Sequence, residues 1–223
     1  MTRSPLFAGL SSDERDALER RASLCKFAPG ESLFAQGATA KELFVITKGR
    51  VKVWRASEDG GSLTLTLLGR GQPIGTLGAA DDRLNHATAT AVTHVEALRW
   101  SIGGLRQLME HNRALTGNVL RTVTNYAEQL IQRLEEMSSV PVEQRIARTL
   151  LRMAESLYGE EAVDGCELPL SRQDLADLTS ATLPTVSRIM SRWRVDRLIA
   201  GTRGRVKLLD RAALARIAGL PAA

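Results

Sequence analysis

The sequence predicts an α+β protein with two domains joined by a long helix, and three observations support this prediction. Short segments of alternating polar and apolar residues, punctuated by glycines, occupy residues 1–110. An uninterrupted heptad stripe of apolar residues follows them. Residues 141–223 then show helical periodicity and a hairpin pattern. Many short strands with glycine turns are typical of an antiparallel β-roll, whereas a heptad stripe is typical of a helix that packs on a partner helix.

Composition bounds the class of protein. The chain has 223 residues with 30 Lys and Arg against 25 Asp and Glu, a net charge of +5. Its hydrophobic fraction of 43% is that of a globular protein, and its two cysteines cannot form a disulfide framework or a four-thiolate iron–sulfur site. The charged N-terminal segment has no signal-peptide core, and no apolar run reaches about 18 residues. We therefore expect a soluble, cytoplasmic protein without a membrane partner.

The β-roll prediction depends on strand periodicity. Ser62–Leu67 and Ala87–Val92 alternate with period two, as half-buried strands do. Leu43–Ile46 and Val51–Trp54 are β-branched and aromatic runs on either side of the turn sequence at residues 48–50, which predicts a hairpin.

The heptad stripe predicts a dimer interface. Its residues are spaced alternately by three and four positions, as a and d positions of a coiled coil are. A second stripe of Leu115, Val119 and Tyr126 is expected to face the β-domain. A helix packed within a monomer is the alternative, but the unbroken seam favours a parallel homodimer. The predicted interface residues are Leu120, Val123, Ala127, Leu130, Leu134 and Met137.

The C-terminal segment reads as a winged helix-turn-helix. Ser171 is a good N-cap and is followed at the third helical position by Asp174, which completes a capping box. Thr182 caps the next helix, and Pro184 stands in its first turn, where the missing N–H is tolerated. Leu198–Leu209 then forms a hairpin pattern, the predicted wing.

A basic cluster overlaps this motif. Residues 188–216 contain nine basic and two acidic side chains, a net charge of +7. Such a cluster is typical of a surface that binds a polyanion, although a solvated basic face would have the same composition.

Two motifs resemble the CRP/FNR superfamily of bacterial transcription regulators. The segment Pro29–Val53 is similar to the β-roll signature of that family, and Leu170–Arg188 is similar to its helix-turn-helix. The resemblance implies a jelly roll like that of cyclic-nucleotide-binding domains at residues 1–111, a dimerisation helix at 112–139 and a DNA-binding domain at 140–223. It implies a homodimer that binds a palindromic site in double-stranded DNA, with RNA polymerase left open as a further partner.

Within the second helix of the motif, Arg188 lies one turn from the start, where a guanidinium can reach guanine O6 and N7 in the major groove. Family members often carry Glu near the start of this helix. Leu183 and Pro184 stand there instead, and they can contact a thymine methyl but cannot accept a hydrogen bond from cytosine. The predicted base contacts are Arg188, Ser187, Thr185, Pro184 and Leu183, and the predicted phosphate contacts are Ser171, Arg172, Gln173, Thr182, Arg192, Arg194, Arg205 and Lys207.

The effector pocket departs from the family pattern. Members that bind cyclic AMP hold the ribose with a Gly-Glu pair and the phosphate with an Arg-Ser pair. The matching positions here read Gly75-Thr76 and Asn85-His86, and apolar residues stand where adenine would find hydroxyls. We therefore do not expect cyclic AMP to be the effector. The candidate pocket residues are Gly75, Thr76, Asn85, His86, Tyr126, Leu130 and Ile131.

The histidines and cysteines of the chain also bear on other ligands and functions. A sensor of the same family that depends on haem or on a cyclic nucleotide is the open alternative, with His86, His94, His111 and Cys25 as the available haem ligands. An iron–sulfur sensor is excluded because two of the four thiolates are missing. We predict no metal site and no catalysis, since the three histidines lack the clustering of a cupin metalloenzyme. A ligand-binding module that controls a partner protein is a remote alternative, against which the basic cluster argues.

Overall fold

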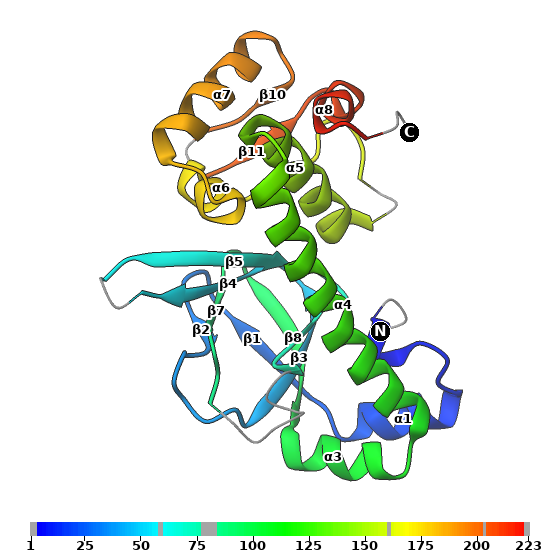
Figure 1. Cartoon of the computed structure of the whole chain (residues 1–223). Coiled ribbons are helices and arrows are strands. Elements are labelled where there is room, and N and C mark those ends of the chain that lie inside the picture. The colour runs from blue at the N-terminus through cyan, green and yellow to red at the C-terminus, as the bar shows by residue number, and fades with distance from the viewer. Residues whose placement is uncertain (1–3, 58–59, 77–83, 160–161, 203, 221–223) are drawn as a thin grey trace. The chain divides into compact units, whose positions relative to one another are not determined.

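The computed structural model describes residues 4–57, 60–76, 84–159, 162–202 and 204–220 (Figure 1). The chain divides into two compact units. One consists of residues 1–62 and 66–129, and the other of residues 63–65 and 130–223. The division falls within the long helix, so each unit contains part of it. The predicted boundaries at residues 112 and 140 separate a sensor domain, a dimerisation helix and a DNA-binding domain, and these assignments stay predictions.

The N-terminal unit is built on two four-stranded sheets, with strand orders β1-β8-β3-β6 and β2-β7-β4-β5. The pairs β1–β8, β3–β8 and β4–β7 are antiparallel, which confirms the predicted antiparallel β-roll. The strands are β1 (Ser23–Phe27), β2 (Ser32–Phe34), β3 (Glu42–Lys48), β4 (Val51–Ala56), β5 (Ser62–Leu68), β6 (Pro73–Ile74), β7 (Thr88–Ala91) and β8 (Val95–Ser101).

The turn at Gly49 does not make the predicted hairpin. β3 pairs with β8 in one sheet, whereas β4 pairs with β7 in the other. Gly49 has a φ of 88°, and a Cβ there would lie 2.2 Å from the carbonyl oxygen of His94, in the connection between β7 and β8. The chain therefore changes sheets at Gly49, because only glycine permits both this backbone conformation and this close approach.

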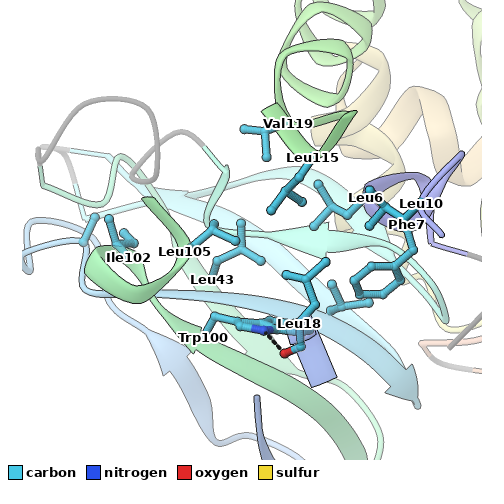
Figure 2. Packing of buried hydrophobic residues seen from close by; sticks show 12 residues of the cluster. Leu6, Phe7, Leu10, Leu18, Leu43, Trp100, Ile102, Leu105, Leu115 and Val119 are labelled. Carbon is cyan, nitrogen blue, oxygen red and sulfur yellow. Dashed lines mark hydrogen bonds between the residues drawn. The ribbon is translucent and has the colours of Figure 1, made fainter. Parts of the chain in front are cut away.

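Helices cover one side of the roll and share a hydrophobic core with it (Figure 2). Trp100 of β8 is buried, and its Nε1–H donates to the carbonyl oxygen of Leu18, 2.9 Å away. Leu115 and Val119 are buried in the same cluster, as predicted for the stripe that faces the β-domain, whereas Tyr126 is only half-buried. The elements around this core are η1 (Pro5–Phe7), α1 (Ser12–Arg20), α3 (Ile102–Glu110) and the start of α4 (Arg113–Ser139). Helix α3 was not predicted from the sequence pattern.

The C-terminal unit is a winged helix-turn-helix, as predicted. Its elements are α5 (Val142–Tyr158), β9 (Glu167–Leu168), α6 (Arg172–Thr179), α7 (Leu183–Val195), β10 (Ile199–Ala200), β11 (Val206–Leu208) and α8 (Arg211–Ala218). β9 joins the predicted wing in a three-stranded sheet of order β10-β11-β9. The sequence pattern predicted neither β9 nor α8, because two residues give no measurable periodicity and α8 overlaps the basic cluster, where charge dominates the pattern. None of the described helices is long and apolar enough to cross a membrane.

Local capping explains where the two helices of the motif begin. The Ser171 hydroxyl accepts from the backbone N–H of Asp174 at 3.0 Å, and the Asp174 carboxylate accepts from the backbone N–H of Ser171 at 2.9 Å. Thr182 caps α7 by accepting from the N–H of Thr185. Ser180, between the helices, has a left-handed φ of 48° that ends α6. These contacts confirm the predicted capping box and the predicted start of α7.

Candidate nucleic-acid interface

Helix α7 divides cleanly into a buried and an exposed face. Val186, Met190 and Trp193 are buried in the C-terminal unit. Leu183 is 43% exposed, and Arg188 is also exposed. The helix therefore presents the side chains of its first turns to solvent, where a recognition helix makes contacts with base edges. Among the remaining predicted base contacts, Pro184 is exposed, and Thr185 and Ser187 are half-buried.

The Thr185 hydroxyl lies beside the Arg188 guanidinium and is itself paired with the Thr182 hydroxyl. The Oγ1 atoms of Thr182 and Thr185 are 2.9 Å apart, and Arg188 Nη2 lies 3.4 Å from Thr185 Oγ1. This last contact is at the long limit of a hydrogen bond, so it orients Arg188 without occupying its other donors. The remaining N–H groups of the guanidinium are available for a bidentate contact.

Two of the polar side chains at the start of α6 already form hydrogen bonds within the helix. The Ser171 hydroxyl donates to Asp174 Oδ2 at 2.6 Å as well as capping the helix. Gln173 Nε2 donates to Asp177 Oδ1 at 2.8 Å. These two predicted phosphate contacts therefore already have partners within the helix, whereas the half-buried Arg172 forms no ion pair among the described residues.

Arg192 is held by an acidic residue that the sequence analysis did not single out. Glu143, in the first turn of α5, forms a hydrogen-bonded ion pair with Arg192 Nη2 and also accepts from the indole N–H of the buried Trp193 at 2.9 Å. The hydrogen bond from Arg192 lowers the pKa of the Glu143 carboxyl and, in turn, raises the pKa of Arg192. Arg192 is thus a poor candidate for the predicted phosphate contact, because a built partner already neutralises it.

The wing contains a second such pair. Arg205 Nη1 lies 2.8 Å from Glu167 Oε1 of β9. Lys207, like Arg194 on α7, is exposed, and no acidic group within the described ranges forms an ion pair with either of them. Gly201 shapes the start of the wing, since it has a φ of 132° and a Cβ there would lie 2.2 Å from the carbonyl oxygen of Arg205. Nothing in the sequence indicated the partners of Arg192 and Arg205, because each pair joins elements distant along the chain.

The predicted dimer seam is an exposed apolar stripe in the single chain. Leu120 is 60% exposed, Leu134 63% and Met137 46%. Leu130 and Ala127 are exposed as well, whereas Val123 is half-buried. Side chains of this kind at heptad spacing are the arrangement that a partner helix covers.

The charged side chains near the end of α4 pair with residues of the same C-terminal unit. Glu136 is only 5% exposed and lies 2.6 Å from Arg152 Nη1 and 3.7 Å from Arg148 Nη1, both on α5. Arg145 Nη1 donates to the carbonyl oxygen of Val140 at 2.8 Å, and its Nε donates to that of Thr179 at 3.0 Å. Glu136 therefore joins the end of α4 to α5, and Arg145 joins the residues between these helices to α6.

The candidate effector residues do not supply the charged groups that the resemblance implies for cyclic AMP. Gly75 has a φ of 91° and its Cβ would lie 2.6 Å from the carbonyl oxygen of Glu42, so glycine is required there by the fold itself. Thr76 and Asn85 are half-buried and neutral, and His86 is exposed. Residues 77–83 lie outside the described residues. Of the α4 candidates, Tyr126 is half-buried, and Leu130 and Ile131 are 39% and 56% exposed.

The histidines and the cysteine that could bind haem or a metal do not form a cluster among the described residues. His94 and His111 are exposed, like His86, and His111 Nδ1 lies 2.9 Å from the carbonyl oxygen of Gln107. The Cys25 thiol donates to the carbonyl oxygen of Ala97, and burial raises its pKa, which disfavours the thiolate needed for ligation. Within the part of the chain that the structure describes, no three His, Cys, Asp or Glu side chains are grouped to hold a metal ion.

Two family models match this chain. Residues 24–112 match the cyclic nucleotide-binding domain, and residues 144–217 match the Crp-like helix-turn-helix domain. The CRP-like cAMP-activated global transcriptional regulator of Mycobacterium tuberculosis is 24% identical over 193 residues, which is 86% of either chain. The cAMP-activated global transcriptional regulator CRP of Salmonella typhimurium is 27% identical over 176 residues, covering 78% of this chain and 84% of that one.

Solved structures show the same fold. The c-di-GMP responsive global regulator CLP of Xanthomonas campestris aligns with a TM-score of 0.73 at 18% identity, over 89% of this chain and 99% of its own. A CRP-family transcriptional regulator from Thermus thermophilus aligns with a TM-score of 0.71 at 24% identity, over 89% of this chain and 98% of its own. With a cyclic nucleotide-binding domain, a long helix and a Crp-like helix-turn-helix in this order, the chain belongs to the CRP/FNR family of transcription regulators.

Proposed function

We propose that the protein is a homodimeric regulator that binds a palindromic site in double-stranded DNA through α7. The observation that carries this proposal is the exposed N-terminal half of α7, which presents Arg188 to solvent while Val186 and Trp193 anchor its opposite face. A recognition helix needs this combination, because its base contacts require an exposed face held rigidly by a buried one.

Arg188 reads a guanine in each half-site, and phosphates position the complex. The guanidinium reaches O6 and N7 of guanine, while Leu183 and Pro184 contact a thymine methyl or exclude a polar base edge. Arg194 and Lys207 are the strongest phosphate contacts, because they are exposed and have no acidic partner among the described residues. Ser171, Gln173 and Arg192 contribute less, because their side chains are engaged within the chain.

Dimerisation uses the exposed seam of α4. Two copies related by a two-fold axis would bury Leu120, Leu130 and Leu134 against the same residues of the partner. The two recognition helices then lie about one turn of DNA apart, so a two-fold symmetric protein selects a palindrome.

The β-roll controls the DNA-binding unit through an effector other than cyclic AMP, or without any effector. The neutral side chains of Thr76 and Asn85 support this, since losing a charge-assisted contact to a phosphate costs roughly 1.5–3 kcal/mol. A haem sensor is the second candidate, supported only by exposed histidines in the described part of the unit. The protein acts by binding DNA and not by catalysis, as its relatives are transcriptional regulators, and contact with RNA polymerase would let it activate transcription.

Selection from a random pool of double-stranded DNA, with the protein free of added ligand, tests the proposal. Enrichment of a palindrome would support a dimeric reader that is competent without an effector. If only salt-sensitive, nonspecific binding is seen, the selection is repeated with cyclic nucleotides and with haem. The absence of a palindrome under every condition would contradict the proposed function.

A single substitution tests the role of Arg188. Arg188→Ala is expected to weaken binding to the selected site by about 1–3 kcal/mol and to leave binding to random DNA nearly unchanged. The control is Arg216→Ala, which removes an exposed arginine from α8, outside the proposed contacts. Equal losses on the two DNAs would make Arg188 a phosphate contact.

A further inference from the structure

We propose that Glu167 is a specificity-determining residue that acts as an exchangeable counter-ion for the wing arginine Arg205. The inference rests on the proposed function, because it concerns how the same surface distinguishes its site from other DNA. In a nonspecific complex Arg205 stays paired with Glu167. In the specific complex a DNA phosphate replaces the carboxylate.

The wing places three charged side chains on one face of a small sheet. In β11, Val206 and Leu208 are buried, so Arg205 and Lys207 project to the opposite, exposed side. Lys207 is the cross-strand partner of Glu167 in β9. The Glu167 carboxylate therefore stands beside both cations, and it forms its ion pair with Arg205.

This pair is built to exchange. The side chains of Arg205 and Glu167 are 64% and 45% exposed, and Nη1 to Oε1 is the only contact between them that the structure shows. Exposed pairs of this kind are weak, so a phosphate held nearby competes effectively with the carboxylate. The guanidinium can also bind a phosphate through two parallel N–H groups, which the single contact to Glu167 does not provide.

The pair at Glu143 shows the contrast. Glu143 binds Arg192 and also accepts from the indole of Trp193, which is 1% exposed. Releasing Arg192 would therefore disturb the packing of α7 as well as an ion pair. Glu167 carries no such structural load, because its side-chain carboxylate bonds only to Arg205 among the described contacts, and its contact to Tyr158 is through the main chain.

Exchange favours the specific site for a geometric reason. When base contacts fix the register of the protein, each phosphate is held at a constant position beside the wing. Without base contacts the protein slides along the duplex, so phosphates pass the wing at changing positions; they attract an unpaired cation but do not hold the geometry that displaces the carboxylate. Glu167 thus removes one cation from nonspecific complexes and leaves the specific complex nearly unaffected.

The experiment measures the salt dependence of binding to the selected palindrome and to a random duplex. We expect Glu167→Gln to steepen the slope of log K against log salt by about 0.9 on random DNA and to leave the slope on the palindrome unchanged. Such a slope change makes the gain in nonspecific affinity about threefold larger at 50 mM than at 200 mM salt. The preference for the palindrome falls accordingly.

Two further variants make the test specific. Glu155→Gln removes an exposed carboxylate from α5 in the same unit and controls for the change in net charge; we expect wild-type slopes. The double variant Glu167→Gln/Arg205→Gln should return the slope on random DNA to the wild-type value, because the released cation is gone. Equal slope changes on both duplexes, or identical results for the Glu167 and Glu155 variants, would overturn the inference while the proposed function stands. A wild-type chain with no preference for any duplex would overturn the proposed function, and with it this inference.

Discussion

The two units of this protein differ in how their functional surfaces relate to the family they belong to. In the C-terminal unit, caps at Ser171 and Thr182 define the helices, and Arg188 is exposed at the position that the resemblance implies. The N-terminal unit retains the roll, but the positions where the resemblance implies contacts to cyclic AMP hold Thr76, Asn85 and His86. A recognition helix needs a few side chains on one face, whereas a ligand pocket needs charged groups from several segments. The fold of such a domain can therefore persist while the side chains at these positions change.

The largest effect is expected from a substitution that destabilises the C-terminal unit, which contains the helix-turn-helix. Trp193→Ala should lower the free energy of unfolding of the C-terminal unit by about 3–5 kcal/mol, because a fully buried indole is removed and Glu143 loses a donor. Thermal unfolding measures the loss. The matched control on the same helix is Val195→Ala, where the side chain is 82% exposed and the change should stay within about 0.5 kcal/mol. Similar losses in the two variants would show that Trp193 does not anchor α7.

The dimer seam, which runs through both units, gives the next largest effect. Leu134→Glu should weaken dimerisation by about 3 kcal/mol, on the order of a hundredfold, because each interface would bury two carboxylates. Sedimentation at micromolar concentration checks the oligomeric state. The fold should survive, since Leu134 is 63% exposed in the single chain. Gln132→Glu adds the same charge at an exposed position outside the seam and should stay dimeric. A dimeric Leu134→Glu variant would sink the proposed interface.

A third prediction concerns the N-terminal unit, where a positive charge is added at position 85. Asn85→Arg places a guanidinium where the resemblance implies a phosphate contact, and it should strengthen cyclic AMP binding by roughly 1.5–3 kcal/mol. Isothermal titration of both proteins with cyclic AMP measures the gain. The backbone of Asn85 is bonded to Gly37 and Ala38, so the substitution leaves the chain path in place. His86→Arg serves as the control, because it adds the same charge one position away. Tight binding by the wild-type chain would contradict our interpretation of the pocket.

The smallest effect concerns the acid dependence of the C-terminal unit. Pairing with Arg192 lowers the pKa of Glu143 below its usual 4.5, so the pair stabilises the fold above that value and the contribution is lost as the pH falls through the lower, folded pKa. The contribution is below about 1 kcal/mol, because the pair is partly exposed and screened by solvent. The difference in unfolding free energy between the wild type and Glu143→Gln should therefore shrink between pH 7 and pH 3.5. A difference that does not depend on pH would mean that the ion pair is not formed.

Much of the architecture could be predicted because it depends on neighbouring residues. Period-two alternation located β5 and β7, and heptad spacing located α4. Ser171, Asp174 and Thr182 act within three residues of themselves, so their capping contacts were visible in the sequence. Short or composite elements escaped this reasoning: β9 has two residues, and α8 lies within a segment dominated by charge.

Only the tertiary structure decided how distant residues meet. The turn at Gly49 was evident, but pairing with β8 and β7 placed β3 and β4 in different sheets. The charges of Arg192 and Arg205 were evident too, yet their ion pairs with Glu143 and Glu167 were not. The physical reason is that periodicity and caps act over one or two turns, whereas ion pairs and sheet partners depend on packing between segments far apart in the chain. Local patterns in the chain were thus enough for the β-roll, the long helix and the helix-turn-helix, whereas the packing of distant segments set the sheet pairing and the acidic partners of Arg192 and Arg205.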